Sequence, residues 1–155
     1  MSIRPVTLAF RLITIGLTVA FIVQQSADLK TLSFVIGNAG HNVAVVFAYW
    51  LDMLRPGFCV SALWVATNVF ARLSRGEAFN ASVVKGMRGI GLNLVLSALC
   101  ATLIVPNLKP VLLGNGWNPV FVPDVESVTI GMIGFVLYLV ARQGTAMKAE
   151  LESFV

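Results

Sequence analysis

The stretch Arg72-Leu-Ser-Arg-Gly-Glu-Ala-Phe-Asn-Ala-Ser-Val-Val-Lys-Gly-Met-Arg88 decides the fold of this chain. It is a basic, glycine-marked segment between two long apolar runs, one of which ends at Leu73 while the other starts near Gly89. Four of the eleven Lys and Arg residues of the chain lie in it, against one acid, Glu77. Basic residues collect on the cytosolic side of membrane proteins. We therefore interpret residues 74–88 as the cytosolic elbow of a membrane hairpin.

The composition is that of an integral membrane protein. Hydrophobic residues make up 57% of the 155 residues and charged residues only 12%, whereas ordinary globular domains carry about 25% charged residues. Such a chain has too few charges to cover a water-exposed surface. The net charge of +4 is explained by basic residues gathered on one side of a bilayer, so no direct nucleic-acid binding is expected. The length suits a single membrane domain, residues 1–155.

Four apolar runs predict four transmembrane helices, because a helix needs about 20 apolar residues to cross the hydrocarbon core. The predicted spans are residues 6–23, 57–73, 89–105 and 125–141. Pro106 is expected to stop the third span, and the prolines and glycines of residues 106–124 predict an outer loop. The tail, residues 142–155, continues at helical spacing and predicts a cytosolic helical extension.

The outer segment between the first two spans, residues 24–56, contains a short apolar helix at residues 42–55. This helix either lies in the outer interface or extends the second span outward. Asp52 and Arg55 are three residues apart, so they can pair on one helical face. The predicted fold class is all-α: an integral membrane four-helix bundle with an outer interfacial helix and a cytosolic C-terminal helical extension.

The distribution of Lys and Arg predicts the orientation, with both termini and the elbow in the cytosol. Eight basic residues then lie inside: Arg4, Arg11, Arg72, Arg75, Lys85, Arg88, Arg142 and Lys148. Three lie outside: Lys30, Arg55 and Lys109.

Three polar residues near the inner ends of the spans form a candidate intramembrane cluster: Arg11, Asn68 and Asn93. Arg11 either extends its long side chain back to the headgroups or finds a buried polar partner. Asn68 lies five residues before Leu73 and Asn93 five residues after Arg88. We therefore predict that the two asparagines lie at one depth and form a hydrogen bond.

Small residues four apart predict the contact faces of the helices, because they let backbones approach closely. Such stripes occur in three of the spans: Gly16 and Ala20; Asn93, Ser97 and Ala101; Ser127 and Gly131. Cys59 and Cys100 both lie in apolar runs, and we predict that they are reduced packing residues, since a disulfide requires Cα atoms within about 7 Å.

No residue pattern in the sequence predicts a catalytic, cofactor or metal site. His41 is the only histidine, and we interpret it as a surface or capping residue in a loop. The acids Asp28, Asp52, Asp124 and Glu126 are all expected outside; they are either solvated charges or a weak cation site. No nucleophile, base and metal ligand converge, so an enzyme is the third choice of function.

Three segments resemble a known family. They are the elbow Phe70-Ala-Arg-Leu-Ser-Arg-Gly-Glu-Ala-Phe79, the helix opening Gly89-Ile-Gly91, and the end Ala146-Met-Lys-Ala-Glu-Leu-Glu-Ser-Phe-Val155. Together they are similar to the bacterial membrane family called domain of unknown function 2975, over roughly residues 50–155. The resemblance implies a small four-span protein of the bacterial inner membrane. Its members are often encoded beside helix-turn-helix regulators, which implies a membrane partner for a regulator.

The leading functional hypothesis is a non-enzymatic membrane protein that works through partners, either as an accessory subunit of a larger complex or as the membrane tether of a regulator. The alternative is a small transporter or channel formed by oligomerisation. Partners are then the lipid bilayer and a second protein or further copies of the chain. The basic elbow residues either set topology alone or contact anionic lipid or a cytosolic protein. These residues are Arg72, Arg75, Lys85 and Arg88.

Overall fold

The computed structural model describes residues 4–29, 39–75 and 81–153, and these form helices with turns and one loop between them. The elements are α1 (Arg4–Leu29), α2 (Ala39–Asp52), α3 (Leu54–Leu73), α4 (Ala81–Leu99), the π-helix η1 (Cys100–Ile104), α5 (Val105–Leu112) and α6 (Val125–Ser153). Four helical stretches among the described residues are long and apolar enough to cross a membrane. The chain is therefore an all-α, multi-pass membrane protein, as the sequence predicted.

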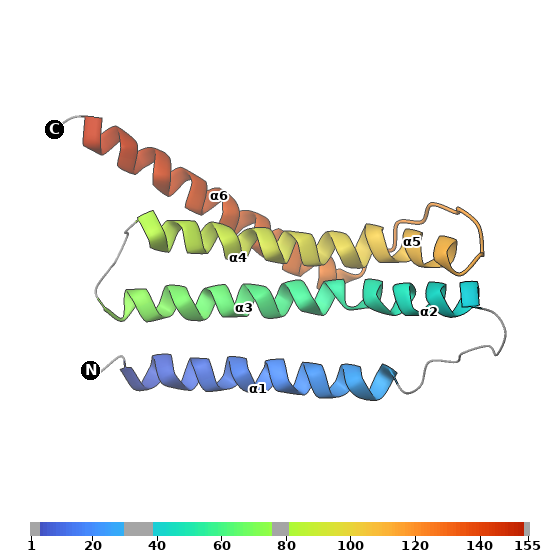
Figure 1. The fold of residues 1–155 in the computed structure, drawn as a ribbon. Helices are drawn as coiled ribbons and strands as arrows, with labels where there is room; N and C mark the ends of the chain where they lie inside the picture. Colours follow the sequence, from blue (N-terminus) through green and yellow to red (C-terminus); the bar gives the residue numbers. More distant parts are fainter. Residues whose placement is uncertain (1–3, 30–38, 76–80, 154–155) are drawn as a thin grey trace.

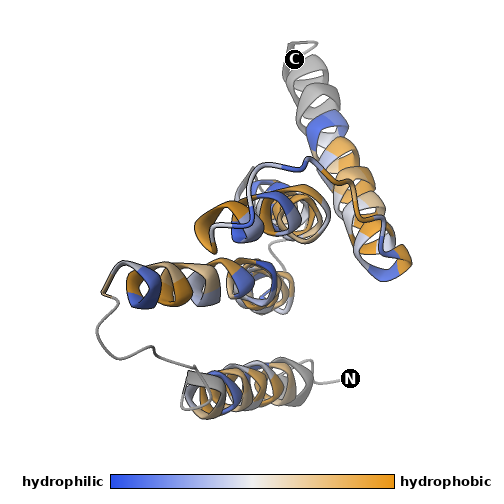
Figure 2. Cartoon of the chain, turned by 90° about the vertical axis from the view of Figure 1, so that its right-hand side faces the viewer, coloured by the Kyte–Doolittle hydropathy of each residue, from blue (hydrophilic) through white to orange (hydrophobic). Residues whose placement is uncertain are grey.

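The long helices lie side by side in the order α1, α3, α4, α6 (Figure 1). Helix α4 packs on α3 and on α6, whereas α1 packs closely only on α3 among the described helices. Viewed along the helices, α6 lies beside α4 and far from α1 (Figure 2). One end of this arrangement, the elbow end, holds the start of α1, the end of α3, the start of α4 and the end of α6 (Figure 1). The opposite end, the loop end, holds α2, α5 and the loop of residues 113–124 (Figure 1).

The boundary between the elbow and the third span differs from the sequence prediction. Residues 81–88, which we assigned to the elbow, form the first turns of α4. The predicted helical extension of the tail is present, because α6 continues without a break from the last span to Ser153. With 29 residues and a rise of about 1.5 Å per residue, α6 is about 43 Å long. This length exceeds the ~30 Å hydrocarbon core of a bilayer.

The short helix α2 is joined to α3 by a single residue, Met53, whose amide donates to the carbonyl of Trp50 at 3.2 Å. Pro56 causes this break, because it has no N–H and its ring clashes with the carbonyl four residues earlier, that of Asp52. Figure 2 shows α2 leaving the end of α3 at an angle. The 20 residues of α3 alone cover about 30 Å, the thickness of the hydrocarbon core, so α3 is long enough to cross it without α2.

Pro106 does not stop the third span, contrary to our prediction, and residues 106–112 are helical rather than part of a loop. Pro106 is the second residue of α5, and without an N–H it cannot donate to the carbonyl of Thr102, four residues earlier. The backbone before it widens into η1, and the loop amide of Val122 donates to the carbonyl of Thr102 at 3.3 Å. The wider turn and this bond satisfy the carbonyl of Thr102, which Pro106 leaves without its usual helical donor.

Glycines allow α4 and α6 to cross closely. A Cβ atom at Gly91 would lie 2.6 Å from the carbonyl oxygen of Gly134, and one at Gly131 would lie 2.7 Å from the Cβ of Ala98. Ser127 is almost completely buried in the same interface. The small-residue stripe on the last span is thus confirmed as a contact face.

The stripe predicted on the first span is wrong. A Cβ atom added at Gly16 would meet nothing within 4 Å, and Ala20 is exposed. Helix α1 instead packs through Thr14, which is completely buried against Thr67 of α3. Phe10 and Phe70 add an aromatic contact with ring centroids 5.0 Å apart.

Candidate functional site

At the elbow end, a cavity of about 440 Å³ opens between the last turns of α3 and the first turns of α4. Four polar side chains line it, those of Asn68, Arg72, Ser82 and Lys85. The guanidinium group of Arg72 donates a hydrogen bond to the hydroxyl of Ser82. None of the described residues that line it is acidic, so these side chains make the cavity electropositive. We call it the elbow cavity.

The structure divides the four basic residues that the sequence singled out in the elbow. Arg72 and Lys85 meet in the elbow cavity. Arg88 turns to α6, where it donates to the hydroxyl of Tyr138 at 3.1 Å and its Cζ lies 5.1 Å from the centre of the ring, a cation–π geometry. Arg75 lies exposed just after the end of α3, outside the cavity lining.

The predicted cluster of Arg11, Asn68 and Asn93 is not formed. Arg11 lies exposed on α1, Asn68 lines the elbow cavity and Asn93 lines a separate cavity nearer the loop end. Asn93 donates to the carbonyl of Gly89, in its own helix, at 2.9 Å rather than to Asn68.

The two asparagines also differ in depth, contrary to our prediction. Gly89 faces Val65 across the α3–α4 interface. Asn93 is four residues past Gly89 toward the loop end, and Asn68 is three residues past Val65 toward the elbow end. Seven residues in total correspond to about 10 Å along the helices.

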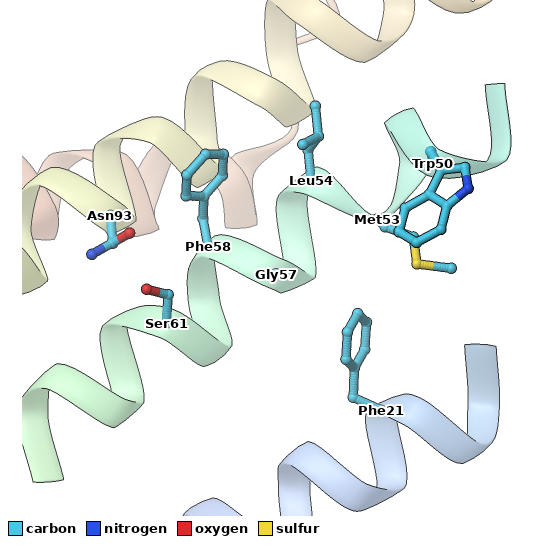
Figure 3. Close-up of a pocket in the computed structure, with 8 residues that line it drawn as sticks. All are labelled: Phe21, Trp50, Met53, Leu54, Gly57, Phe58, Ser61 and Asn93. Atoms are coloured by element: carbon cyan, nitrogen blue, oxygen red, sulfur yellow. The ribbon is translucent and has the colours of Figure 1, made fainter. Parts of the chain in front are cut away.

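The second cavity opens sideways between α1, α2, α3 and α4 and has a volume of about 390 Å³ (Figure 3). Most of its lining is apolar, with Phe21 from α1, Trp50 from α2 and Phe58 from α3. Its polar groups are Ser61 and Asn93, which project into the space between α3 and α4 (Figure 3). We call it the lateral cavity. Sequence analysis missed it, because it depends on how four separate segments converge.

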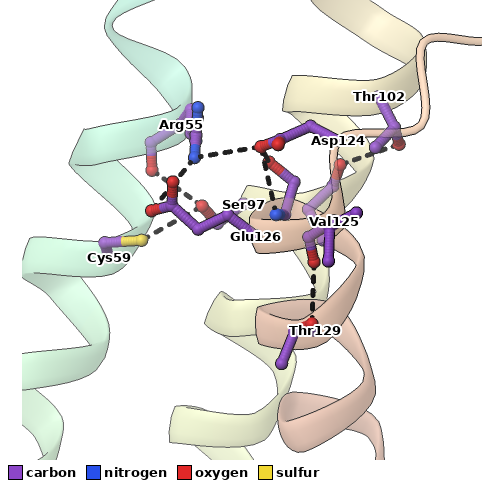
Figure 4. Close-up of polar contacts among 10 residues, drawn as sticks. Arg55, Cys59, Ser97, Thr102, Asp124, Val125, Glu126 and Thr129 are labelled. Atoms are coloured by element: carbon purple, nitrogen blue, oxygen red, sulfur yellow. Dashed lines mark hydrogen bonds and ion pairs between the residues drawn. The ribbon is translucent and has the colours of Figure 1, made fainter.

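At the loop end, ion pairs join α3 to the start of α6 and α5 to α2, and Figure 4 shows the first of these. A guanidinium nitrogen of Arg55 lies 3.6 Å from a carboxylate oxygen of Asp124 and 3.5 Å from one of Glu126. Lys109 of α5 contacts Asp52 of α2 at 2.6 Å. The predicted pair of Asp52 and Arg55 is therefore wrong, because the break at Met53 separates the two residues and each finds a partner on another element.

Asp124 also caps the first turn of α6. Its carboxylate accepts hydrogen bonds from the hydroxyl of Ser127 at 2.8 Å and from the backbone amide of Ser127 at 3.2 Å. These bonds, with a smaller contribution from the charge of Arg55, hold the pKa of Asp124 below its usual value of 3.8. The Asp-x-x-Ser spacing before an apolar run is an N-cap pattern, so this signal was present in the sequence.

The two cysteines are free, as predicted. Cys100 is buried, and the Sγ of Cys59 lies 3.1 Å from the hydroxyl of Ser97. Ser97 in turn donates to the backbone carbonyl of Arg55 at 2.9 Å. This chain of hydrogen bonds joins α3 to α4 just below the ion pairs (Figure 4).

His41 lies in the first turn of α2 rather than in a loop. Within residues 4–29, 39–75 and 81–153, no three His, Cys, Asp or Glu side chains come close enough to hold a metal ion. Asp124 and Glu126, which we considered for a cation site, face Arg55 instead.

Comparison with known proteins adds one finding. A protein-family model described as "Protein of unknown function (DUF2975)" matches residues 44–155. No curated protein and no solved structure matches the chain.

Proposed function

The chain belongs to the DUF2975 family of proteins of unknown function, and on that premise we propose that it is a non-enzymatic membrane protein that acts through a protein partner. It serves as the accessory subunit of a larger membrane complex or as the membrane tether of a cytosolic regulator. It resides in the bacterial inner membrane with the elbow end in the cytosol.

The observation that carries this proposal is the polar pair in the lateral cavity. The side-chain nitrogen of Asn93 donates to Gly89 of its own helix, and within the described residues no donor reaches its carbonyl oxygen. Ser61, seven residues from the start of α3, lies about 10 Å along the helix from Leu54. Both groups thus lie at hydrocarbon depth, where a transmembrane segment of a partner that offers a polar side chain would bond to them.

The other polar residues buried inside the fold support the same proposal, because each already holds two helices together or bonds to its own helix. Thr14 pairs with Thr67, Ser97 with Cys59, and Ser127 with Asp124. No side-chain nitrogen or oxygen buried in the described part of the chain lacks a hydrogen bond. These groups stabilise the fold, whereas Ser61 and Asn93 line the lateral cavity, where a partner can reach them.

The proposed orientation is supported by where the charges lie. The start of α1, the end of α3, the start of α4 and the end of α6 are all at the elbow end (Figure 1). Basic residues near the ends of the spans face the cytosol, and eight of the eleven belong to these segments by the count given above.

The test is affinity purification of the full chain from bacterial membranes in mild detergent, with wild type and Asn93→Leu compared. We expect a stoichiometric protein partner with the wild type and its loss with Asn93→Leu. Asn68→Leu is the matched control, because it makes the same chemical change in the elbow cavity and should keep the partner. A symmetric homo-oligomer without another protein would favour the alternative function, a transporter or channel. Equal recovery of the partner with both variants would contradict the role of the lateral cavity.

A further inference from the structure

We propose that the elbow cavity binds one anionic phospholipid, with the lipid phosphate between Arg72 and Lys85 and an acyl chain along the α3–α4 groove. The site is separate from the lateral cavity and does not depend on the partner proposed above. Its polar end, its apolar end and its depth each contribute to the inference.

The polar end offers donors suited to a phosphate. Arg72 and Lys85 line the cavity from facing helices, and Asn68 lies one helical turn from Arg72 on the same face. Arg forms paired hydrogen bonds with phosphate oxygens, and Lys adds a mobile charge. The hydrogen bond to Ser82 holds the Arg72 guanidinium group at the cavity.

The positive charge at this end is not neutralised by the described side chains. The ion pairs formed by described residues involve Arg55 and Lys109, at the loop end, and neither Arg72 nor Lys85. Ser82 belongs to the first turn of α4, where the helix dipole adds a partial positive charge. An anion is therefore favoured here over a zwitterion or a neutral group.

The opposite end of the cavity is apolar, and it is lined by Val65, Val69, Gly86 and Gly89. A side chain at Gly86 would collide with Val69, and a Cβ at Gly89 would lie 3.5 Å from a Val65 methyl group. The two glycines thus let α3 and α4 approach closely along the apolar half of the cavity. A free phosphate ion gains no contact from this apolar half of the cavity, whereas the acyl chain of a lipid fills it.

The depth of the cavity matches a lipid. Arg72 is the next-to-last residue of α3, whose length equals the thickness of the hydrocarbon core, so it lies at headgroup level. Val65 is seven residues earlier, about 10 Å deeper. The cationic side chains therefore lie at the depth of a lipid phosphate. The apolar side chains lie deeper, at the depth of its acyl chain.

The experiment is native mass spectrometry of the full chain in detergent, with phosphatidylglycerol or phosphatidylcholine added in equal amounts. We expect one retained phosphatidylglycerol in excess over phosphatidylcholine. Arg72→Gln/Lys85→Gln should reduce this retention about tenfold, since each basic residue near an anionic surface adds to the affinity. The matched control, Arg75→Gln/Arg88→Gln, removes equal charge from the same end outside the cavity and should retain the lipid.

A second arm separates the lipid from free phosphate. Gly89→Leu fills the apolar half without changing charge and should reduce phosphatidylglycerol retention, with helicity and monodispersity checked by circular dichroism and size exclusion. Inorganic phosphate at millimolar concentration should not displace the lipid. Displacement by phosphate with no effect of Gly89→Leu would show an anion site without a lipid. Equal retention by the two double variants would overturn the proposal altogether.

Discussion

The hydroxyl oxygens of Thr14 and Thr67 lie 3.0 Å apart, and both side chains are almost completely buried between α1 and α3. Each hydroxyl also lies within hydrogen-bond distance of a carbonyl of its own helix, 2.8 Å for Thr14 and 2.9 Å for Thr67. Since a hydroxyl has one proton, one threonine donates across the interface while the other donates to its own helix. This pair anchors the first helix, which packs closely on α3 alone among the described helices.

Replacing Thr67 by Val should weaken the docking of α1 without unfolding the other helices. Val keeps the shape of Thr but removes the hydroxyl, and an interhelical hydrogen bond in a membrane is worth about 0.6 kcal/mol on average. A double-mutant cycle with Thr14→Val, read from thermal unfolding in detergent, should give a coupling of this order. Thr129→Val is the control, because Thr129 bonds only to Val125 of its own helix. Coupling near zero would show that the pair contributes nothing.

Gly91→Ala should destabilise the protein strongly for so small a change. The added methyl group would lie 2.6 Å from the Gly134 carbonyl oxygen and 2.7 Å from the Tyr138 amide nitrogen, which are backbone atoms that cannot rotate away. Forcing extra volume into such a contact costs about 1–3 kcal/mol. Gly16→Ala is the matched control on α1, where nothing lies within 4 Å, and it should be neutral or slightly stabilising. Equal melting temperatures for the two variants would contradict the close crossing of α4 and α6.

Acid should loosen the start of α6. The hydrogen bonds from Ser127 lower the pKa of Asp124 in the folded protein, so the folded state binds its proton less readily than the unfolded state. The stabilisation is therefore present above the ordinary value of 3.8 and is lost as the pH falls through the lowered pKa. Amide hydrogen exchange at residues 125–130 should rise over this window in the wild type. Asp124→Asn, which keeps an oxygen acceptor but cannot titrate there, should lack this contribution, and an identical pH response would refute it.

Cysteine labelling tests the proposed orientation. In a background without Cys59 and Cys100, new cysteines at Ser74 and Ser153 should not react in intact cells with a thiol reagent that cannot cross the inner membrane. A cysteine at Asn115, in the exposed loop at the other end, should react. We expect this orientation because basic residues are in excess at the elbow end. Labelling at Ser74 with protection at Asn115 would reverse the orientation.

The sequence by itself determined the membrane class and the existence of the four spans. These depend on the number of consecutive apolar residues, a local property that needs no knowledge of neighbours. The start of α6 at Val125 was also predictable, because the loop residues before it and the Asp-x-x-Ser cap act within one helical turn. The free state of the two cysteines was also predictable, because a disulfide requires a short distance between the two Cα atoms that few residue pairs meet.

Only the tertiary structure decided which polar residues meet. Asn68 and Asn93 were placed at one depth by counting from an elbow that ends at Arg88, but α4 begins at Ala81, so the count was taken from the wrong helix boundary. Asp52 pairs with Lys109, 57 residues away, rather than with Arg55 three residues away. The physical reason is that such contacts depend on helix register, kinks and crossing angles. These are set by packing between segments that are distant in the chain, and a local pattern carries no record of them.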